Sequence, residues 1–259
     1  PTGEARAVAA RGAVVGREFS AQAATDLLPE EARPFAAQHL EALVRKELIE
    51  QARLGPAGEE RFRFGHVLIQ QAAYRSIPKR VRGELHESLA AWLERAVPEE
   101  EPEYAEIVGY HLEQAFRYRA ELGPATDEDR VLASRAADLL ASAGGRAFSR
   151  GDMPASVNLL GRSSSLLGAD NRAGLDLLPD LGYALFEIGE LDRASTVLAE
   201  AIEGGRSSSD RGVEWRATVK LGHVRMWADP ESVDPDSLGD EAARAIEVLE
   251  ELGDDAGLA

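Results

Sequence analysis

The stretch that decides the fold is Phe62-Arg63-Phe64-Gly65-His66-Val67-Leu68-Ile69-Gln70-Gln71-Ala72-Ala73-Tyr74. Its first residues alternate apolar and polar side chains, which is the period of a half-buried strand. From Val67 onward the apolar side chains recur at helical spacing, and His66 stands at the joint. The sequence therefore predicts a strand that leads directly into an amphipathic helix.

The elements around this stretch follow from local signals. Residues 4–96 read as helix, helix, helix, strand, strand and two more helices, and the first five are in the order of a winged helix. Ser20 can cap the second helix, because its hydroxyl can accept from a free backbone N–H. The expected boundaries are a helix over 21–28, a helix ending at about Lys46, strands over 48–54 and 61–64 with a turn at 55–58, and helices from Val67 and Pro78.

Composition points to a mostly α protein. The chain has 259 residues, of which 44% are hydrophobic and only 6% aromatic, so it can bury a sizeable core without being rich in strand formers. It contains no cysteine, which excludes disulfides, thiolate metal sites and a cysteine nucleophile. No apolar run approaches the roughly 18 residues of a membrane span. We therefore expect a soluble, cytoplasmic protein with no membrane partner.

Charge is distributed unevenly along the chain. The formal net charge is -17, and residues 1–96 hold 14 Lys/Arg against 13 Asp/Glu, whereas residues 97–259 hold 15 against 33. A strongly negative field repels a phosphate backbone. The second part of the chain is therefore a poor candidate for binding nucleic acid, and its charge fits a solvated helical surface.

A repeat emerges in the second part. Leu181-Gly182-Tyr183-Ala184 begins a pattern of small and bulky side chains that is similar to a tetratricopeptide repeat, whose helices need small residues where their backbones approach. We expect the repeat residues to be structural and not to bind ligands: Gly182, Gly189, Ala194, Leu198 and Ala201. A shift of 38 residues back gives a degenerate copy: Gly144, Gly151, Ser156, Leu160 and Ser163. A third copy starts at Gly222, and a longer turn at 229–236 precedes its remaining members: Ala242, Ile246 and Leu249.

The pattern Phe-x-Phe-x-His-x-Leu at 62–68, with Tyr74 six residues later, resembles the segment behind the nucleotide-binding domain of bacterial STAND signalling ATPases. These large proteins are fused to LuxR-type DNA-binding domains or accompany class III nucleotide cyclases. The resemblance implies a winged-helix-like domain and following helices over 1–96, a linker and connecting helix over 97–126 with the helix at about 104–122, and a truncated tetratricopeptide-like array over 127–259. It also implies that the chain is a piece of a larger protein whose ATPase domain precedes it.

His66 is the sharpest candidate for a functional residue. The resemblance implies that it donates a hydrogen bond to the β-phosphate of bound ADP and holds the protein inactive. The nucleotide, ATP or ADP, would be a cofactor of the larger protein only, because this chain has no Gly-x-x-x-x-Gly-Lys-Ser/Thr loop and no recognisable catalytic constellation. The alternative is that His66 caps the following helix or lies satisfied in the core.

The densest basic patch invites a second reading. It comprises Arg75, Lys79, Arg80 and Arg82. With further cations it would suit phosphate contacts of a DNA-binding winged helix: Arg33, Arg45, Lys46, Arg61 and Arg63. The first domain is nearly neutral, however, so we expect the patch to face the ATPase domain or to pair with the acidic helices that follow it. Trp215, Met226 and Trp227 are expected to pack between helices, and not to form an exposed aromatic site.

These observations favour a non-catalytic regulatory region that couples nucleotide state to an unknown protein or small effector on the repeats. Two alternatives stay open at this stage. One is a transcriptional regulator that binds DNA through the winged helix, and the other is a plain scaffold or adaptor in which no nucleotide takes part. The output domain, the effector and the oligomeric state do not follow from the sequence.

Overall fold

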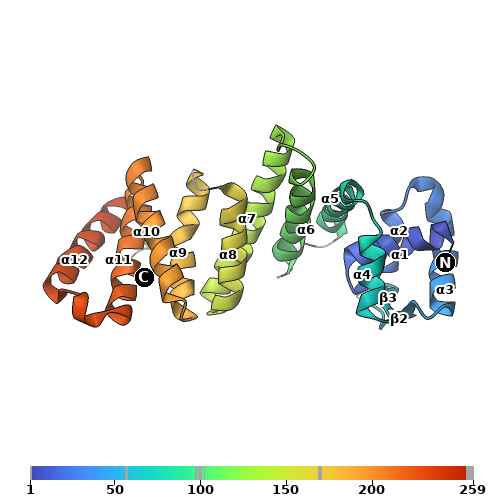
Figure 1. The fold of residues 1–259 in the computed structure, drawn as a ribbon, viewed down its shortest axis with the longest axis horizontal. Helices are drawn as coiled ribbons and strands as arrows, with labels where there is room; N and C mark the ends of the chain where they lie inside the picture. Colours follow the sequence, from blue (N-terminus) through green and yellow to red (C-terminus); the bar gives the residue numbers. More distant parts are fainter. Residues whose placement is uncertain are drawn as a thin grey trace. The chain divides into compact units, whose positions relative to one another are not determined.

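The structure is a computed structural model that describes residues 2–55, 58–96, 98, 101, 103–168 and 171–254. The predicted turn at 55–58 and the predicted linker around Pro98 lie partly outside these residues, as does the end of the chain beyond Asp254. The chain is mostly α with a small antiparallel sheet followed by an array of helices, so the predicted fold class is confirmed (Figure 1). It divides into two compact units, residues 1–132 and 133–259.

The first unit combines short helices with the sheet. Its elements, in chain order, are α1 (Gly3–Val15), β1 (Glu18–Ser20), α2 (Ala21–Asp26), the 3-10 helix η1 (Glu30–Phe35), α3 (Ala36–Arg45), β2 (Ile49–Gln51), β3 (Arg61–Phe64), α4 (Val67–Arg75), α5 (Lys79–Ala96) and α6 (Tyr104–Ala120). The strand-to-helix joint predicted at His66 is present. The helix expected at about 104–122 is also present.

The sheet contains a strand that the sequence did not reveal. Among the described residues the sheet has three strands in the order β1-β3-β2, and both pairings are antiparallel. Phe62 of β3 lies opposite Phe19 on one side and opposite Gln51 on the other. The two-strand prediction was therefore incomplete. β1 has only three residues, and its last one, Ser20, also caps α2 by accepting from the backbone N–H of Ala23 at 3.1 Å.

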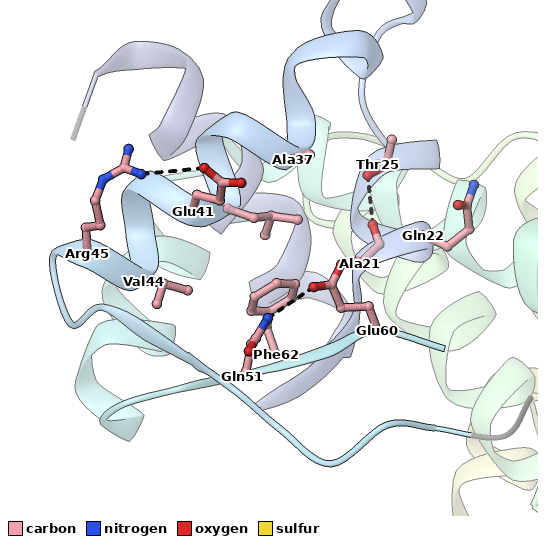
Figure 2. A pocket seen from close by; sticks show the side chains of 11 residues that line it. Ala21, Gln22, Thr25, Ala37, Glu41, Val44, Arg45, Gln51, Glu60 and Phe62 are labelled. Atoms are coloured by element: carbon pink, nitrogen blue, oxygen red, sulfur yellow. Dashed lines mark hydrogen bonds and ion pairs between the residues drawn. The ribbon is translucent and has the colours of Figure 1, made fainter. Parts of the chain in front are cut away.

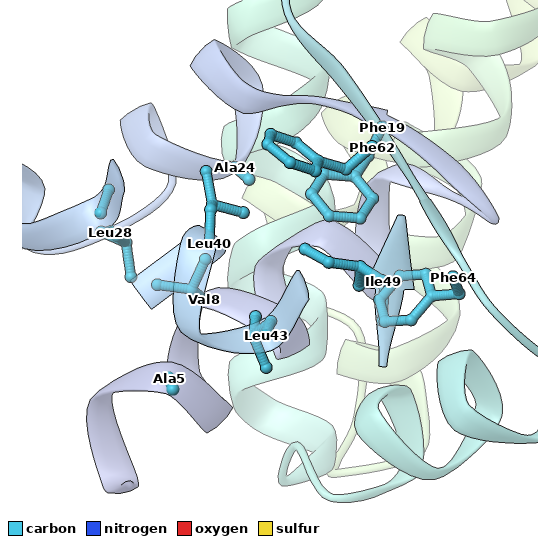
Figure 3. Packing of buried hydrophobic residues seen from close by; sticks show 12 residues of the cluster. Ala5, Val8, Phe19, Ala24, Leu28, Leu40, Leu43, Ile49, Phe62 and Phe64 are labelled. Carbon is cyan, nitrogen blue, oxygen red and sulfur yellow. The ribbon is translucent and has the colours of Figure 1, made fainter. Parts of the chain in front are cut away.

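Aromatic side chains of the sheet anchor the core of the first unit. Phe19 is fully buried, and its ring centroid lies 6.0 Å from that of Phe62 and 5.3 Å from that of Phe64. Figure 3 shows these rings above Leu40, Leu43 and other side chains of α1 and α3. The alternation of 61–64 thus places Phe62 and Phe64 inside and Arg61 and Arg63 toward solvent, as the period-two pattern predicts.

The second unit is an array of antiparallel helices. The boundary between the units falls within α7 (Asp127–Ser149), whose start carries the predicted capping box: the backbone N–H of Asp129 donates to Thr126, and that of Thr126 donates to the Asp129 carboxylate. The remaining elements are α8 (Met153–Leu167), α9 (Arg172–Glu187), α10 (Leu191–Ser208), α11 (Arg211–Ala228), the 3-10 helix η3 (Pro230–Ser232) and α12 (Pro235–Leu252). Neighbouring helices from α8 to α12 pack on one another, and α9 also contacts α11.

One contact between a glycine and a leucine recurs through the array. A Cβ added to Gly144 would lie 2.7 Å from the side chain of Leu160, one added to Gly182 would lie 2.5 Å from Leu198, and one added to Gly222 would lie 2.6 Å from Leu238. Each leucine follows its glycine by 16 residues, although the glycines themselves are 38 and 40 residues apart. The repeat is therefore defined by a backbone surface on one helix that receives a leucine from the next.

The third repeat differs from its predicted register. Ile246 was expected in the core, but 52% of its surface is exposed, and Ala245, Val248 and Leu249 are buried instead. The reason lies in the turn before α12. The first two hairpins turn at a glycine with positive φ, Gly151 and Gly189, whereas Asp229 occupies the corresponding place with φ -149° and a 3-10 turn follows it. The longer turn makes α12 start later and rotates its apolar face.

None of the helices in the described ranges is both long enough and apolar enough to cross a membrane.

Candidate functional site

His66 lies at the surface and caps α4. Its Nδ1 accepts a hydrogen bond from the backbone N–H of Leu68 at 3.1 Å, and its backbone is extended, as an N-cap requires. Because Nδ1 is the acceptor, the proton of the neutral ring is on Nε2. The side chain is exposed. The capping alternative raised from the sequence is thus realised, and it leaves the second nitrogen of the ring as a hydrogen-bond donor.

The predicted basic patch separates into exposed and inward-facing members. Lys79 pairs with Glu121 just after α6 at 2.7 Å, and Arg80 pairs with Glu84 one turn along α5 at 3.0 Å. Arg75 is exposed. Arg82 instead lies flat against two rings, with its guanidinium carbon 5.0 Å from the centroid of Tyr74 and 5.5 Å from that of Tyr118. Arg82 therefore does not belong to a free cationic surface.

Arg82 is the first member of a buried polar chain that links α4, α5 and α6. Its Nη1 lies 3.5 Å from the Tyr118 hydroxyl, which is 2.9 Å from the Tyr74 hydroxyl. The Tyr74 hydroxyl is 2.8 Å from Nε2 of His86, and Nδ1 of His86 is 2.8 Å from Nδ1 of His111. Arg82 can only donate, so one consistent assignment has each hydroxyl or ring donate to the next along the chain. We call this set the polar relay: Arg82, Tyr118, Tyr74, His86 and His111.

Burial keeps the polar relay uncharged apart from Arg82. Desolvation lowers the pKa of His86 to about 3, and the neighbouring His111 and Arg82 lower it further in the same direction. Desolvation also lowers the pKa of His111 to about 4. The pKa of Tyr74 is raised, first by burial and then by its hydrogen bond to Tyr118. The polar relay consequently fastens three helices together and offers no charged group for proton transfer at neutral pH.

A groove of about 420 Å³ opens between α2, α3 and the sheet (Figure 2). Its floor is apolar and includes Leu40 and Phe62. Its rim carries Glu60, which accepts from Gln51 at 3.2 Å, and Glu41, which pairs with Arg45 at 3.5 Å. α3 is the helix that would enter a DNA groove in a helix-turn-helix protein. A phosphate that approaches this face would meet carboxylates.

The other cations that suggested DNA contact are engaged within the first unit. Arg61 pairs with Glu18 at 3.3 Å, and Arg63 pairs with Glu50 at 2.8 Å. Arg33 donates through Nε to the carbonyl of Leu28 and through Nη2 to that of Asp26, both at 3.0 Å. Lys46 is exposed at the end of α3. A carboxylate or a carbonyl therefore competes for most of these cations.

The repeat residues singled out from the sequence lie where a structural role would put them. Ala194, Leu198 and Ala201 have no exposed surface and belong to one apolar cluster of the second unit. Gly182 is buried against Leu198, and Gly189 has φ +83°, a backbone conformation that favours glycine. Nothing in this cluster offers a ligand a polar contact.

A ladder of side chains joins α9 to α11 at a spacing of 40 residues. Arg216 pairs with Asp176, and Lys220 pairs with Asp180 at 2.5 Å. One step further along, the ring of His223 meets that of Tyr183 at 6.2 Å between centroids. The equivalent surface of two successive repeats thus changes from ion pairs at one end to aromatic contacts at the other.

The aromatic end of the ladder is a continuous chain of rings, which we call the aromatic strip: Phe148, Tyr183, Phe186, His223 and Trp227. The centroid distances are 6.1 Å for Phe148–Tyr183, 5.0 Å for Phe186–His223 and 6.4 Å for Phe186–Trp227. Trp227 is 68% exposed and Met226 is 44% exposed. The expectation that Met226 and Trp227 pack between helices was therefore wrong, because residues 226–227 fall on the solvent face of the last turn of α11; Trp215 is half-buried.

Sequence reasoning missed the polar relay and the aromatic strip. The members of the polar relay lie on three helices, with His86 and His111 separated by 25 residues, and no local motif connects them. The aromatic strip had a usable signal: the 40-residue offset that pairs Gly182 with Gly222 also pairs Tyr183 with His223. In the described part of the chain, no group of three or more His, Asp or Glu side chains could hold a metal ion.

No protein-family model matches the chain, and no curated protein matches it. Its function is therefore argued from the resemblance at residues 62–74 and from the geometry above.

Proposed function

We propose that the chain is a non-catalytic regulatory and protein-interaction region of a larger STAND-type signalling ATPase. Its first unit transmits the nucleotide state of an ATPase domain, and its helical repeats bind a protein or small effector. The observation that carries the proposal is the element order, in which helix, strand, two helices and two strands share one sheet of order β1-β3-β2, and helical hairpins follow. This order supports the winged-helix and repeat arrangement that the resemblance implies.

The repeats support the interaction role. Their conserved spacing of glycine and leucine serves packing, which leaves the exposed side chains of α9 and α11 free to vary. The aromatic strip is the part of that surface with the largest exposed ring. Exposed aromatic side chains with fixed neighbours are typical anchors of protein interfaces.

The geometry of His66 suits a nucleotide-dependent contact. When bound, a nucleotide supplies a phosphate oxygen that accepts a hydrogen bond. The cap formed by Nδ1 leaves Nε2–H exposed as a donor, so capping and phosphate binding use different nitrogens of one ring. The chain holds no phosphate loop, so the remaining contacts of the nucleotide would come from the ATPase domain. A switch then arises if the contact is made in one nucleotide state and lost in the other.

The exposed basic residues fit an interface better than a DNA contact. Lys79 already pairs with Glu121, which is one of the two roles expected for the patch. The face of α3 carries Glu41 beside Arg45, so duplex DNA would meet charges of both signs there. No observation favours the DNA-binding alternative over the regulatory one.

The test uses the protein encoded by the full reading frame, with two substitutions of His66. His66→Asn keeps an N-cap acceptor but removes the imidazole, whereas His66→Ala removes both. ADP retained after purification and the ATPase rate are measured for both variants, beside Ser20→Ala, which removes the cap of α2 only. We expect both His66 variants to release ADP and to raise the ATPase rate, and Ser20→Ala to do neither.

Two results would oppose the proposal. If His66→Asn behaves like the unaltered protein while His66→Ala does not, the histidine serves only as a cap. If neither variant changes ADP retention, no nucleotide state passes through this residue, and the chain is better described as a scaffold or adaptor.

A further inference from the structure

We propose that the exposed end of the aromatic strip, Phe186 and Trp227 with the carboxylate of Glu187, binds a cationic side chain, an arginine or a lysine, of a peptide partner. This inference rests on the proposed function, because it names the chemical class of partner that the repeats would take.

The first argument is that the rings are available and held in place. Trp227 is 68% exposed at the last turn of α11. Its ring is inclined by 60° to that of Phe186, and Phe186 in turn meets His223 at an interplanar angle of 78°. A ring that is fixed on one side by its neighbours loses little conformational freedom when a ligand covers the other side. Tryptophan is also the ring to which cations bind best.

The second argument is that the aromatic strip already holds a cation of its own. Nζ of Lys220 lies 5.6 Å from the ring centroid of Phe148 and 5.7 Å from that of Tyr183, and it pairs with Asp180 at 2.5 Å. Two ring faces and one carboxylate thus bind an ammonium group at one end of the strip. The arrangement shows which ligand chemistry suits this surface.

The third argument is that the same combination recurs further along without a cation. Phe186 and Trp227 supply the rings, and Glu187 supplies an exposed carboxylate that is hydrogen-bonded to Tyr183. Within the described ranges, no Lys or Arg lies over the ring of Phe186 or Trp227. A guanidinium or ammonium group from a partner would complete the pattern that Lys220 makes internally.

The charge of the second unit favours the same class of partner. Residues 133–259 hold 12 Lys/Arg against 23 Asp/Glu. Such an excess attracts basic peptides and repels acidic ones, mostly through the association rate. A field alone would not select one place on the surface, so the rings must provide the specificity.

The experiment is isothermal titration calorimetry on the 259-residue chain at an ionic strength near 0.15 M, where charges more than about 8 Å apart are screened. The probes are three acetylated and amidated pentapeptides: Ala-Arg-Ala-Arg-Ala, its Gln counterpart and its Leu counterpart. The variants are Trp227→Leu, which keeps apolar bulk but removes the π face, Glu187→Gln, and the matched control Glu200→Gln on the exposed surface of α10. Circular dichroism checks that the variants retain their helices.

We expect the Arg peptide to bind more tightly than the Gln and Leu peptides. A cation–π contact is worth about two- to thirtyfold in affinity, so Trp227→Leu should weaken binding of the Arg peptide about five- to tenfold. Glu187→Gln should weaken it to a similar extent, whereas Glu200→Gln should change it less than about twofold, the size of an exposed and screened charge contact.

Three results would overturn the inference. Equal effects of Glu187→Gln and Glu200→Gln, with none from Trp227→Leu, would mean that only the overall field acts. Tighter binding of the Leu peptide would make the strip an apolar docking surface. Self-association that Trp227→Leu abolishes would make it an interface between copies of the chain. Each leaves the ADP-retention result on His66 untouched, so failure of this inference is distinguishable from failure of the proposed function.

Discussion

The two units of the chain differ in how their contacting residues are spaced in the sequence. In the second unit the decisive contacts recur at fixed offsets, 16 residues from each glycine to its leucine and 40 residues between the rungs of the ladder. In the first unit the contacts are single and distant: Gln70 donates to the carbonyl of Ala13 across 57 residues, and Trp92 donates to Asp26 across 66. A repeated contact leaves a period in the sequence, and a single one leaves no such mark.

The largest effect that would sharpen this comparison concerns Phe19. This ring is fully buried on a three-residue strand, so Phe19→Ala should lower the free energy of unfolding by about 3–5 kcal/mol. Phe35→Ala is the control, because Phe35 is 56% exposed and should cost less than about 1 kcal/mol. Urea unfolding measures both. Similar values for the two variants would mean that β1 is not part of the cooperative core.

The next effect comes from the polar relay and depends on pH. The folded-state pKa values of His86 and His111, about 3 and about 4, lie below the unfolded value of about 6.5. The unfolded chain therefore binds more protons in that window, and the stabilisation is complete above pH 6.5 and falls as pH falls. Between pH 7 and pH 5 the loss should reach about 2–4 kcal/mol.

The matching variant is His111→Asn, which leaves one buried histidine. It should roughly halve the slope of unfolding free energy against pH between 7 and 5, as measured by urea unfolding at each pH. An unchanged slope would assign the pH dependence to groups outside the polar relay. The polar relay would then be a set of hydrogen bonds without the burial cost inferred for it.

A smaller effect probes the repeat contact with two adjacent glycines. A Cβ at Gly144 would clash with Leu160, including its backbone nitrogen at 3.1 Å, whereas a Cβ at Gly145 would meet nothing within 4 Å. Gly144→Ala should therefore cost about 1–3 kcal/mol through overpacking, and Gly145→Ala should be neutral or stabilising by up to about 1 kcal/mol. Thermal unfolding followed by circular dichroism compares them. Equal shifts would show that the glycine and leucine contact does not define the repeat.

The smallest effect separates the two roles of His66 by stability alone. His66→Ala should lower the free energy of unfolding by about 0.5–2 kcal/mol, because the N–H of Leu68 loses its acceptor. His66→Asn should restore most of that loss. Hydrogen exchange of the first turn of α4 is the local readout, and equal protection in both variants would mean that the ring contributes no cap.

The same contrast decides how much of the molecule could be predicted from the sequence. The fold class, the joint at His66 and the capping box at Thr126 follow from local patterns, as does the glycine repeat through Gly182. β1 could not be predicted, because three residues are too few to show alternation and Phe19 finds its partner 43 residues away. The polar relay was equally hidden, since a histidine inside an amphipathic helix looks the same whether or not another ring faces it.

For the surfaces, the sequence gave weaker guidance than for the core. Arg82 reads as part of a basic cluster, but a cluster in the sequence does not tell which side chain turns inward to stack on Tyr74. Trp227 reads as a core residue because large aromatic side chains are usually buried. Its exposure depends on the rotation of the last turn of α11, which local patterning does not determine.

The turn between α11 and α12 shows where this architecture can take up extra length. α8 and α10 begin nine residues after their glycines, Gly144 and Gly182, whereas α12 begins 13 residues after Gly222; Leu238 nevertheless meets Gly222 at the usual offset. The four additional residues are absorbed without shifting the contact that defines the hairpin. Segment 230–234 is consequently the natural place to graft an epitope or a fluorescent reporter into the array, because foreign sequence inserted there would leave the register of the helices unchanged.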